Sequence, residues 1–374
     1  MRKLPVSLLR PGMKVGRTIY NSDGKVLLNV GKVISENYIS RLRSLGIPAI
    51  YIEDGILDDV EINDIVADET RTIAKTNIKK IHTKTFEGLK KGKVPDIDGK
   101  TVSYTIEKII DDILNKKDLM VNLSDIRTLD DYTFAHSVNV CILSLLTGIS
   151  LGYNKNALMC LGTGALLHDI GKTKVPIEIL NKPGKLTEEE FQEIKNHSIY
   201  GFDILRQQED ISVTAAHIAY EHHERYNGEG YPRQLKGSSI HEFAQVTGMV
   251  DVYDALVSDR VYRGGFLPHE ALEMITGSGN FLFDYELVKT FTKNIAAYPT
   301  GTTVELNTGE IGIVIGTPKW FPSRPDVRLI QFKDNKINTI GEIHLSENTN
   351  LLIKRVIPEE EFANYYGMDK VIKL

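Results

Sequence analysis

The sequence is poor in cysteine: only Cys141 and Cys160 occur among its 374 residues, and both lie in apolar patterns of helical period. Two such cysteines exclude a disulfide framework and indicate a reducing compartment. Long apolar runs are also missing, since no stretch approaches the ~18 residues that a transmembrane helix needs. The N-terminal MRKLPVSLLRPGM lacks the continuous apolar core of a signal peptide. We therefore expect a cytoplasmic protein without a membrane span.

An excess of basic residues is missing as well. The chain has 45 Lys and Arg residues against 50 Asp and Glu residues, a formal net charge of −5. A broad nucleic-acid interface needs a basic face, so we expect neither DNA nor RNA as a partner. A small anionic ligand stays compatible with this charge, because bound metal ions can reverse the charge of a cleft.

Both ends of the chain are predicted to form small modules. Residues 1–54 show short apolar runs around turn residues, and a helix that Ser35 would cap, which predicts an α+β module. Residues 299–374 change to an apolar period of two, with Asn-Thr-Gly and Gly-Thr turns, and are predicted to form a β module. Neither stretch has a cluster of residues with metal-ligand spacing, and we interpret the first as a docking or regulatory module.

The middle of the chain is predicted to be helical. Residues 55–100 pass from an acidic to a basic stretch with imperfect helical spacing, which indicates a solvated connecting helix with His82 exposed. Residues 101–298 are helical throughout, beginning with an apolar stripe from Ile106 to Leu114. The later helices are predicted at residues 132–149, 156–168, 187–207, 212–224, 243–258 and 268–277.

One helix start is especially clear. Thr187 has the side chain of an N-cap residue, and Glu190 follows it by three positions, which is the pattern of a capping box. The helix that begins here would run to about Gln207 and carry His197 near its middle.

Within the helical region, the stretch LLHDIGKTK at residues 166–174 carries adjacent His168 and Asp169. A neighbouring imidazole and carboxylate are a poor choice for an apolar core, but they suit a divalent metal ion that takes nitrogen and oxygen ligands. A single pair is weak support for a metal site. Five further residues of ligand type in the same region strengthen it: His136, His197, His222, His223 and Asp251.

The pair His222 and His223 favours two metal ions over one. Adjacent residues on a helix point about 100° apart, so the two rings cannot easily bind one ion, but each can serve a different ion. Asp169 would then lie between the ions and bridge them. Because the set has imidazole and carboxylate but no thiolate, we predict two divalent transition-metal ions as cofactors, with iron or manganese preferred.

Two neighbouring metal ions suit the hydrolysis of a phosphodiester, because they generate hydroxide at neutral pH and stabilise the attacking and leaving oxygens. Lys172, three residues after Asp169, is placed to meet a phosphate oxygen. The alternative role for Lys172 is that of a cation at a helix C-terminus, which needs no ligand.

The stretch HHERYNGEGYPRQL, residues 222–235, begins with the histidine pair and continues into a loop, which we call the GYP loop. Gly228 and Gly230 allow positive φ, Pro232 fixes the exit, and Tyr231 could stack on a nucleobase. A plain loop would use the same glycines, so the loop alone is only suggestive.

Two arginines lie just beyond Asp251, in the stretch DVYDALVSDRVYRGG. They are Arg260 and Arg263. The guanidinium fork suits a phosphate or a guanine edge, and exposed salt bridges are the alternative.

The order of these motifs resembles the HD-GYP family of the HD phosphohydrolase superfamily. Five separated blocks match in order, namely His136, HDIGK, His197, HHERYNGEGYP and DVYDALVSDRVYR. The resemblance covers roughly residues 120–298 and implies an all-helical, metal-dependent phosphodiesterase domain, for which we take the bounds 101–298. The expected fold is therefore mainly α, a helical HD-type bundle with a small α+β module before it and a small β module after it.

The resemblance also assigns a role to each matching residue. It implies that the metal ligands are His136, His168, Asp169, His197, His222, His223 and Asp251, with Asp169 as the bridging residue. Lys172 matches the lysine that contacts the substrate phosphate, and Tyr231 matches the loop tyrosine. Two basic substrate contacts of the family are matched by Arg260 and Arg263.

Two positions decide between variants of the family's site. Asp254, one helical turn after Asp251, is a rival ligand, and we choose Asp251. Family members with a third metal carry a glutamate four residues before the first histidine, where this chain has Tyr132. This departure favours two metals and puts complete conversion of the substrate to GMP in doubt.

The resemblance implies hydrolysis of cyclic di-GMP to linear pGpG and, in some members, onward to GMP. Our hypothesis is attack by a hydroxide that bridges the two ions, with Lys172 stabilising charge on the phosphoryl oxygens. Three alternatives stay open: a cyclic di-GMP sensor without turnover, a hydrolase of another cyclic dinucleotide, and a scaffold whose GYP loop binds a diguanylate cyclase or another signalling protein. A second copy of the chain, in a homodimer, is a further candidate partner.

Overall fold

The structure is a computed structural model that describes residues 1–21, 25–53, 55–60, 64–116, 120–121, 132–258, 264–333 and 336–365. The chain forms two compact units. Unit 1 contains Met1–Ile65, Asp118–Tyr132 and Lys293–Leu374, and unit 2 contains Val66–Lys117 and Thr133–Thr292. The two predicted end modules thus fall in one unit, and most of the predicted connector falls in the other. The four-part division of the sequence stays a prediction.

Unit 2 is helical, as predicted. Its elements are α2 (Asp68–Lys90), α3 (Gly99–Asn115), α4 (Tyr132–Ser150), α5 (Lys155–Leu167), η3 (Ile170–Lys174), α6 (Ile177–Leu180), α7 (Glu188–Lys195), α8 (His197–Leu205), α9 (Val213–Glu221), η4 (Gly237–Ser239), α10 (Glu242–Val257), α11 (Pro268–Gly277) and α12 (Tyr285–Thr292). The isoleucines of the predicted stripe on α3 are buried, because they recur every three or four residues and share one face. Leu114 lies off that face and is 47% exposed, so its place in the stripe was wrong.

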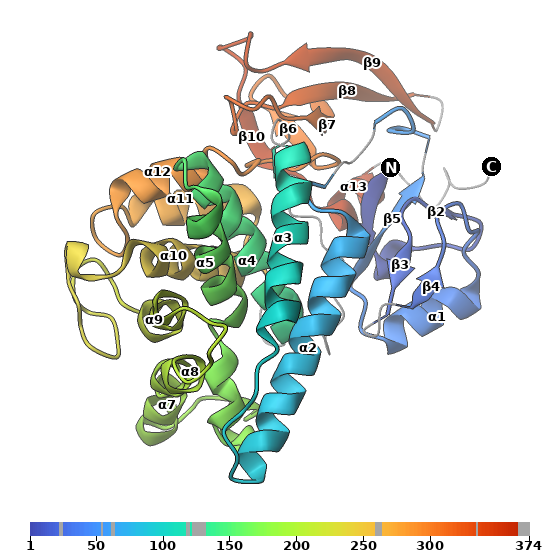
Figure 1. The fold of residues 1–374 in the computed structure, drawn as a ribbon. Coiled ribbons are helices and arrows are strands. Elements are labelled where there is room, and N and C mark those ends of the chain that lie inside the picture. The colour runs from blue at the N-terminus through green and yellow to red at the C-terminus, as the bar shows by residue number, and fades with distance from the viewer. Residues whose placement is uncertain are drawn as a thin grey trace. The chain divides into compact units, whose positions relative to one another are not determined.

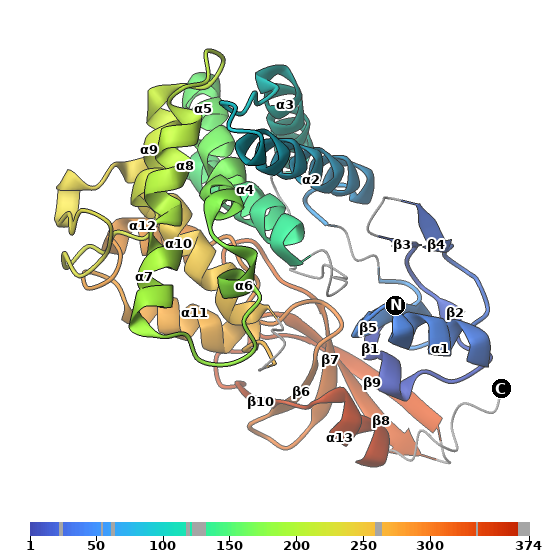
Figure 2. The same ribbon diagram turned by 90° about the horizontal axis from the view of Figure 1, so that it is seen from below.

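Helix α2 packs against the bundle, although a solvated connector was predicted. Its buried residues recur at helical spacing, and they are Arg71, Ala74, Ile78, Ile81, His82 and Thr85. The helix lies beside α3 in both views (Figures 1 and 2). Small and β-branched residues on one face are enough to bury it, while the many lysines of α2 cover its other faces. The prediction that His82 is exposed is wrong, since it is 8% exposed.

The helix predicted from Thr187 to about Gln207 is two helices. The capping box of Thr187 and Glu190 is present, but α7 ends at Lys195 and α8 begins at His197. Gly171 of η3 approaches this break so closely that a Cβ atom there would lie 1.9 Å from the His197 carbonyl oxygen. Only glycine allows this approach, and it brings the end of the HDIGK motif against the first residue of α8.

Helix α4 is the core helix of unit 2. Among the described residues, one window, Thr133–Ser150, is long and apolar enough to cross a membrane, and 78% of it is buried inside the protein. The expectation that no apolar stretch reaches this length is therefore wrong. The burial is that of a helix surrounded by other helices of a globular core.

The described residues of unit 1 form three sheets and the α-helices α1 and α13. The N-terminal part has a sheet of order β1-β5-β2, formed by β1 (Arg2–Pro5), β5 (Ala49–Glu53) and β2 (Lys14–Val15), and a hairpin of β3 (Ile19–Tyr20) and β4 (Val26–Leu28). A short η1 (Val6–Leu8) precedes α1 (Glu36–Ser44). The predicted cap is confirmed, because the Ser35 hydroxyl accepts a hydrogen bond from the Tyr38 N–H.

The C-terminal part of unit 1 is a five-stranded antiparallel sheet of order β10-β6-β7-β8-β9. Its strands are β6 (Thr303–Leu306), β7 (Ile311–Gly316), β8 (Asp326–Lys333), β9 (Lys336–His344) and β10 (Ile353–Val356), and α13 (Glu359–Tyr365) follows. The sequence analysis missed β9, whose polar residues KINTIGEIH hide the period of two. The two parts share a core cluster, in which Leu57 packs with Ile313 and Phe362.

Candidate metal centre

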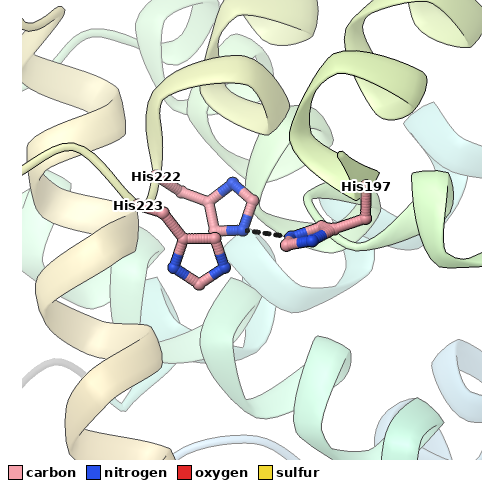
Figure 3. A group of neighbouring side chains, drawn as sticks. All are labelled: His197, His222 and His223. Carbon is pink, nitrogen blue, oxygen red and sulfur yellow. Dashed lines mark hydrogen bonds between the residues drawn. The ribbon is translucent and has the colours of Figure 1, made fainter. Parts of the chain in front are cut away.

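The seven predicted ligands lie together in unit 2, in three groups whose ligand atoms are within 4.8 Å of one another. Group A is His136, His168 and Asp251, from α4, the end of α5 and α10. Group B is His197, His222 and His223, from α8 and the end of α9 (Figure 3). The shared group is His168, Asp169 and His222. Helices distant in sequence thus bring every predicted ligand to one place.

Group A has the arrangement expected around a cation. His136 Nε2 lies 3.0 Å and His168 Nε2 lies 4.0 Å from the same oxygen, Asp251 Oδ1. His168 Nδ1 bonds the Ala165 carbonyl at 2.8 Å, which leaves Nε2 facing the group. That buried Nε2 has no hydrogen-bond partner among the described residues. A buried nitrogen without a partner, aimed at a carboxylate oxygen, fits a metal ligand.

In group B, the Nε2 lone pairs of His197 and His222 face each other. His197 donates its Nδ1–H to the Ile194 carbonyl at 2.6 Å, and His222 donates its Nδ1–H to the Ala219 carbonyl at 2.9 Å. Their Nε2 atoms lie 3.3 Å apart, the contact drawn as a dashed line in Figure 3. In these tautomers both Nε2 atoms are acceptors, so a cation between them satisfies both. Burial lowers the pKa of His197 to about 4, so its ring is neutral at pH 7.

His222 and His223 both belong to group B, and the expectation that each serves a different ion stays a prediction. Helix α9 ends at Glu221, and His222 is its C-cap, so the two rings do not follow the 100° rotation of a continuous helix. Their centroids are 4.0 Å apart. His222 also belongs to the shared group, so it is the histidine that lies between groups A and B.

Asp169 has one oxygen toward each group. Its Oδ2 lies 3.4 Å from His168 Nε2, and its Oδ1 lies 3.5 Å from His197 Nε2. Lys172 Nζ lies 2.6 Å from the same Oδ2. Burial would raise the pKa of Asp169, but the charges of Lys172 and His168 hold that pKa well below its usual range. An ionised carboxylate in this position supports a bridging role between two cations.

Asp254 lies behind the site and Asp251 lies in it. Asp254 Oδ2 accepts the Nδ1–H of His136 at 2.8 Å, and Asp254 Oδ1 accepts an N–H of Asn139 at 3.1 Å. A carboxylate that holds the far nitrogen of a histidine orients its other nitrogen toward a metal. This geometry supports Asp251 as the ligand and Asp254 as the residue that orients His136, a role that the sequence analysis did not assign.

The GYP loop places Tyr231 over group B. The Tyr231 ring stacks on His223 with centroids 4.7 Å apart and an interplanar angle of 28°. Gly228 has φ +86°, as expected, but Gly230 does not have positive φ. It is needed for space instead, since a Cβ there would lie 2.3 Å from the Arg225 nitrogen. Tyr231 therefore lies against the candidate ligands His223 and His197.

Two glutamates that flank the histidine pair anchor this loop. Glu224 accepts hydrogen bonds from the N–H groups of Arg233 at 2.7 Å and Leu235 at 2.9 Å. Glu221 accepts one from the N–H of His241 at 2.8 Å and pairs with the Arg233 guanidinium. Both glutamates are buried, so water does not compete for these bonds. The sequence analysis missed this function, although two charged residues beside buried histidines were a visible signal.

A cavity of about 500 Å³ opens beside Tyr231. Its lining includes Phe191, Lys195 and Ile199 from α7 and α8, and Tyr231 and Pro232 from the loop. Lys195 Nζ lies 4.5 Å from the centroid of Phe191 and 5.8 Å from that of Tyr231. The sequence analysis did not single out Lys195, because nothing in its spacing marks it.

Two predicted substrate contacts, Arg260 and Arg263, lie outside the described residues. Their role stays a prediction from the sequence.

Metal binding to group A should release a proton. Burial would lower the pKa of His136, but its hydrogen bonds to Asp251 and Asp254 outweigh this and raise the pKa to about 10. The metal-free ring is therefore charged at pH 7, and a metal needs it neutral. We expect about one proton released per group A site below pH 10, and an affinity that rises about tenfold per pH unit up to that pH. Calorimetry in two buffers of different ionisation enthalpy measures this; equal apparent enthalpies would contradict it.

Comparison with known proteins agrees with this geometry. Residues 110–287 match the family model described as HD domain. Residues 303–365 match a model described as KOW domain associated with HD domain. The first match contains all seven candidate ligands.

Residues 110–287 belong to the HD domain family. Among similar proteins is a cyclic di-GMP phosphodiesterase of Pseudomonas aeruginosa, 36% identical over 219 residues, which are 59% of this chain and 53% of that protein. A cyclic di-GMP phosphodiesterase of Thermotoga maritima is 35% identical over 195 residues, 52% of each chain. A 3'3'-cGAMP-specific phosphodiesterase of Vibrio cholerae is 36% identical over 166 residues, 44% of this chain and 38% of that protein. The alignments therefore span about half of these relatives or less.

Proposed function

We propose that this chain is a metal-dependent phosphodiesterase that hydrolyses cyclic di-GMP to pGpG. The observation that carries the proposal is the pair of ligand groups, A and B, with the ionised Asp169 between them. Relatives that share the HD domain are named cyclic di-GMP phosphodiesterases. Buried ionisable groups with shifted pKa values are typical of catalytic sites, which favours a hydrolase over a binding module.

The donor set fits two divalent ions, for which we propose iron or manganese. Groups A and B share no residue, so each can hold one ion, and Asp169 contributes an oxygen to both. Both cysteines are free and neither belongs to the groups, so thiolate is not a ligand. Histidine and carboxylate donors are typical of catalytic iron and manganese sites. The bound ions would activate a water molecule and neutralise charge on the phosphoryl oxygens.

The remaining residues would bind and orient the dinucleotide. Lys172 holds its ammonium beside Asp169, where it can stabilise negative charge that develops on a phosphoryl oxygen. Tyr231 lines the cavity and stacks its ring on His223, so a nucleobase in the cavity would meet this tyrosine. Burial raises the pKa of Tyr231 further above neutrality, so its hydroxyl stays a hydrogen-bond donor. Arg260 and Arg263 are proposed as further substrate contacts.

Linear pGpG is the proposed product, because Tyr132 stands where a third-metal glutamate would be expected. The proposal further includes a cytoplasmic location, and a diguanylate cyclase or other signalling protein as partner of the GYP loop. A homodimer is the proposed assembly.

An assay with defined metal content tests the function. The full chain, purified anaerobically and loaded with Fe²⁺ or Mn²⁺, is incubated with cyclic di-GMP, and the products are separated by chromatography. We expect conversion to pGpG with a metal, and none after chelation. A metal-loaded protein that leaves the substrate intact with both ions, while binding it tightly, would overturn the enzyme and favour a sensor.

A second substrate is favoured by one specific finding. The relatives include enzymes of Vibrio cholerae named as specific for 3'3'-cGAMP, at 36% and 33% identity. The same assay with 3'3'-cGAMP in a matched concentration series decides between the two dinucleotides. We expect a larger kcat/KM for cyclic di-GMP, and the reverse order would transfer the proposal to 3'3'-cGAMP.

Removal of the Tyr231 ring should weaken substrate binding. Stacking of a base on an aromatic ring contributes about 1–3 kcal/mol, so we expect Tyr231→Ala to raise KM by about tenfold or more. Tyr231→Phe keeps the ring and its contact with His223, so its KM should stay within about threefold of wild type. Steady-state kinetics of the two variants measure the difference, and equal KM values for both would argue against stacking.

A further inference from the structure

A line of buried hydrogen bonds connects helix α2 to group A. An Arg71 guanidinium N–H donates to Asn139 Oδ1 at 3.0 Å, and Asn139 Nδ2 donates to Asp254 Oδ1 at 3.1 Å. Asp254 Oδ2 in turn accepts the Nδ1–H of His136 at 2.8 Å, and His136 Nε2 lies 3.0 Å from Asp251 Oδ1. The line begins on a helix outside residues 110–287 and ends at two candidate ligands.

Every member of this line is withdrawn from water. Arg71 is 5% exposed, Asn139 is 1% exposed and Asp254 is fully buried. In such surroundings water does not replace a hydrogen bond that one residue loses. The side chains of the line therefore keep their orientations together or lose them together. A change at Arg71 therefore reaches Asp254 through a single intermediate, Asn139.

The chemistry of each link fixes the direction of the next. Arginine only donates, so the end of Asn139 that faces Arg71 must be its oxygen. The amide nitrogen then faces Asp254, and an ionised carboxylate accepts it. Asp254 is left with its other oxygen for the Nδ1–H of His136. Once the His136 ring is neutral, this bond selects the tautomer whose Nε2 lone pair faces group A.

We propose that Arg71 is a positioning residue of the metal centre, which orients Asn139 and, through Asp254, holds His136 ready to bind a metal ion. The proposal rests on the proposed metal-dependent function, but it concerns metal affinity and not turnover. Helix α2 is then part of the centre as well as a packing element. Asn139 is the one residue that stands between the Arg71 guanidinium and the Asp254 carboxylate in this line.

A purely structural role is the rival explanation, because Arg71 is also part of the buried face of α2. In that case its replacement would loosen the helix and weaken both ions together. A positioning role predicts a loss confined to the ion of group A, since group B shares no residue with the line.

Titration of the full-length metal-free protein with Mn²⁺, with free Mn²⁺ counted by electron paramagnetic resonance, separates the two roles. Loss of an outer partner of a metal ligand costs about 10–100-fold in affinity, and we expect Arg71→Met to weaken one of the two ions by about tenfold. Arg71→Lys should recover most of the affinity, because a single N–H donor serves Asn139. Lys80→Met, which removes an exposed cation of the same helix, should leave both ions at wild-type affinity.

A second variant keeps the test valid if Arg71→Met does not fold. Asn139→Asp retains a partner for Arg71 but turns the donor toward Asp254 into an acceptor, so it should weaken the same ion. Where both variants fold, the double variant should lose no more than Asn139→Asp alone, because the two residues act through one bond. Unchanged Mn²⁺ affinities, equal losses at both ions, or additive losses would overturn the proposal. If the wild-type protein binds two Mn²⁺ ions but does not hydrolyse cyclic di-GMP, the proposed phosphodiesterase function is refuted. The role of Arg71 in metal binding is then still tested by the Mn²⁺ affinities.

Discussion

Asp169→Asn should reduce the turnover of cyclic di-GMP by about 10³-fold and leave the protein folded. The substitution keeps the volume of the side chain but removes the negative charge between groups A and B. The two oxygens of Asp169 lie 3.4 Å from His168 Nε2 and 3.5 Å from His197 Nε2, so this carboxylate contacts both groups. Asp251, the other carboxylate among the seven candidates, belongs to group A. The measurements are single-turnover hydrolysis and the metal content after loading with Mn²⁺.

The control for this variant is Asp203→Asn on α8. That carboxylate pairs with Arg206 on the surface, its side chain is 43% exposed, and it belongs to none of the ligand groups. We expect its rate and metal content to equal those of wild type. If Asp169→Asn instead kept two ions and hydrolysed the substrate within a few-fold of wild type, Asp169 would not be the bridging residue.

Removal of the metal should lower the melting temperature of the HD domain. Without a cation, group B holds lone pairs 3.3 Å apart, and the buried His168 Nε2 lacks a hydrogen-bond partner among the described residues. Binding to the folded state alone stabilises by about 4 kcal/mol when the free ion is at a thousand times its Kd. For a unit of this size we expect a shift of about 10 °C between chelated and Mn²⁺-loaded protein.

Differential scanning calorimetry at fixed pH measures that shift, and His223→Ala is its matched variant. His223 belongs to group B alone, so the variant should keep the contribution of group A and lose most of that of group B. Identical melting temperatures with and without Mn²⁺ in the wild type would mean that the seven residues do not bind metal in the folded state.

Apolar spacing in the sequence predicted the helical region, and residue type singled out seven candidate ligands that the structure brings together. His168 and Asp169 stand out because charged or ligand-type residues interrupt an otherwise apolar helix, and the structure gathers all seven candidates. The helix at Pro268–Gly277 and the capping box at Thr187 were predicted because their signals are local, which is where sequence patterns carry most information.

Features that depend on packing could not be predicted. The break between α7 and α8 lies where Gly171 approaches the His197 carbonyl, a contact between segments 26 residues apart. The end of α9 at Glu221 places His222 and His223 in one group, against the rule for a continuous helix. The burial of Arg71 and His82 was hidden because polar and charged residues make up most of α2. In each case a tertiary contact outweighed a local pattern.

The most direct test of the central claim is an anomalous diffraction map of crystals of the Mn²⁺-loaded protein. We expect two peaks, one among His136, His168 and Asp251 and the other among His197, His222 and His223, with Asp169 in contact with both. No peak in this region, or one peak without Asp169 among its neighbours, would contradict the account.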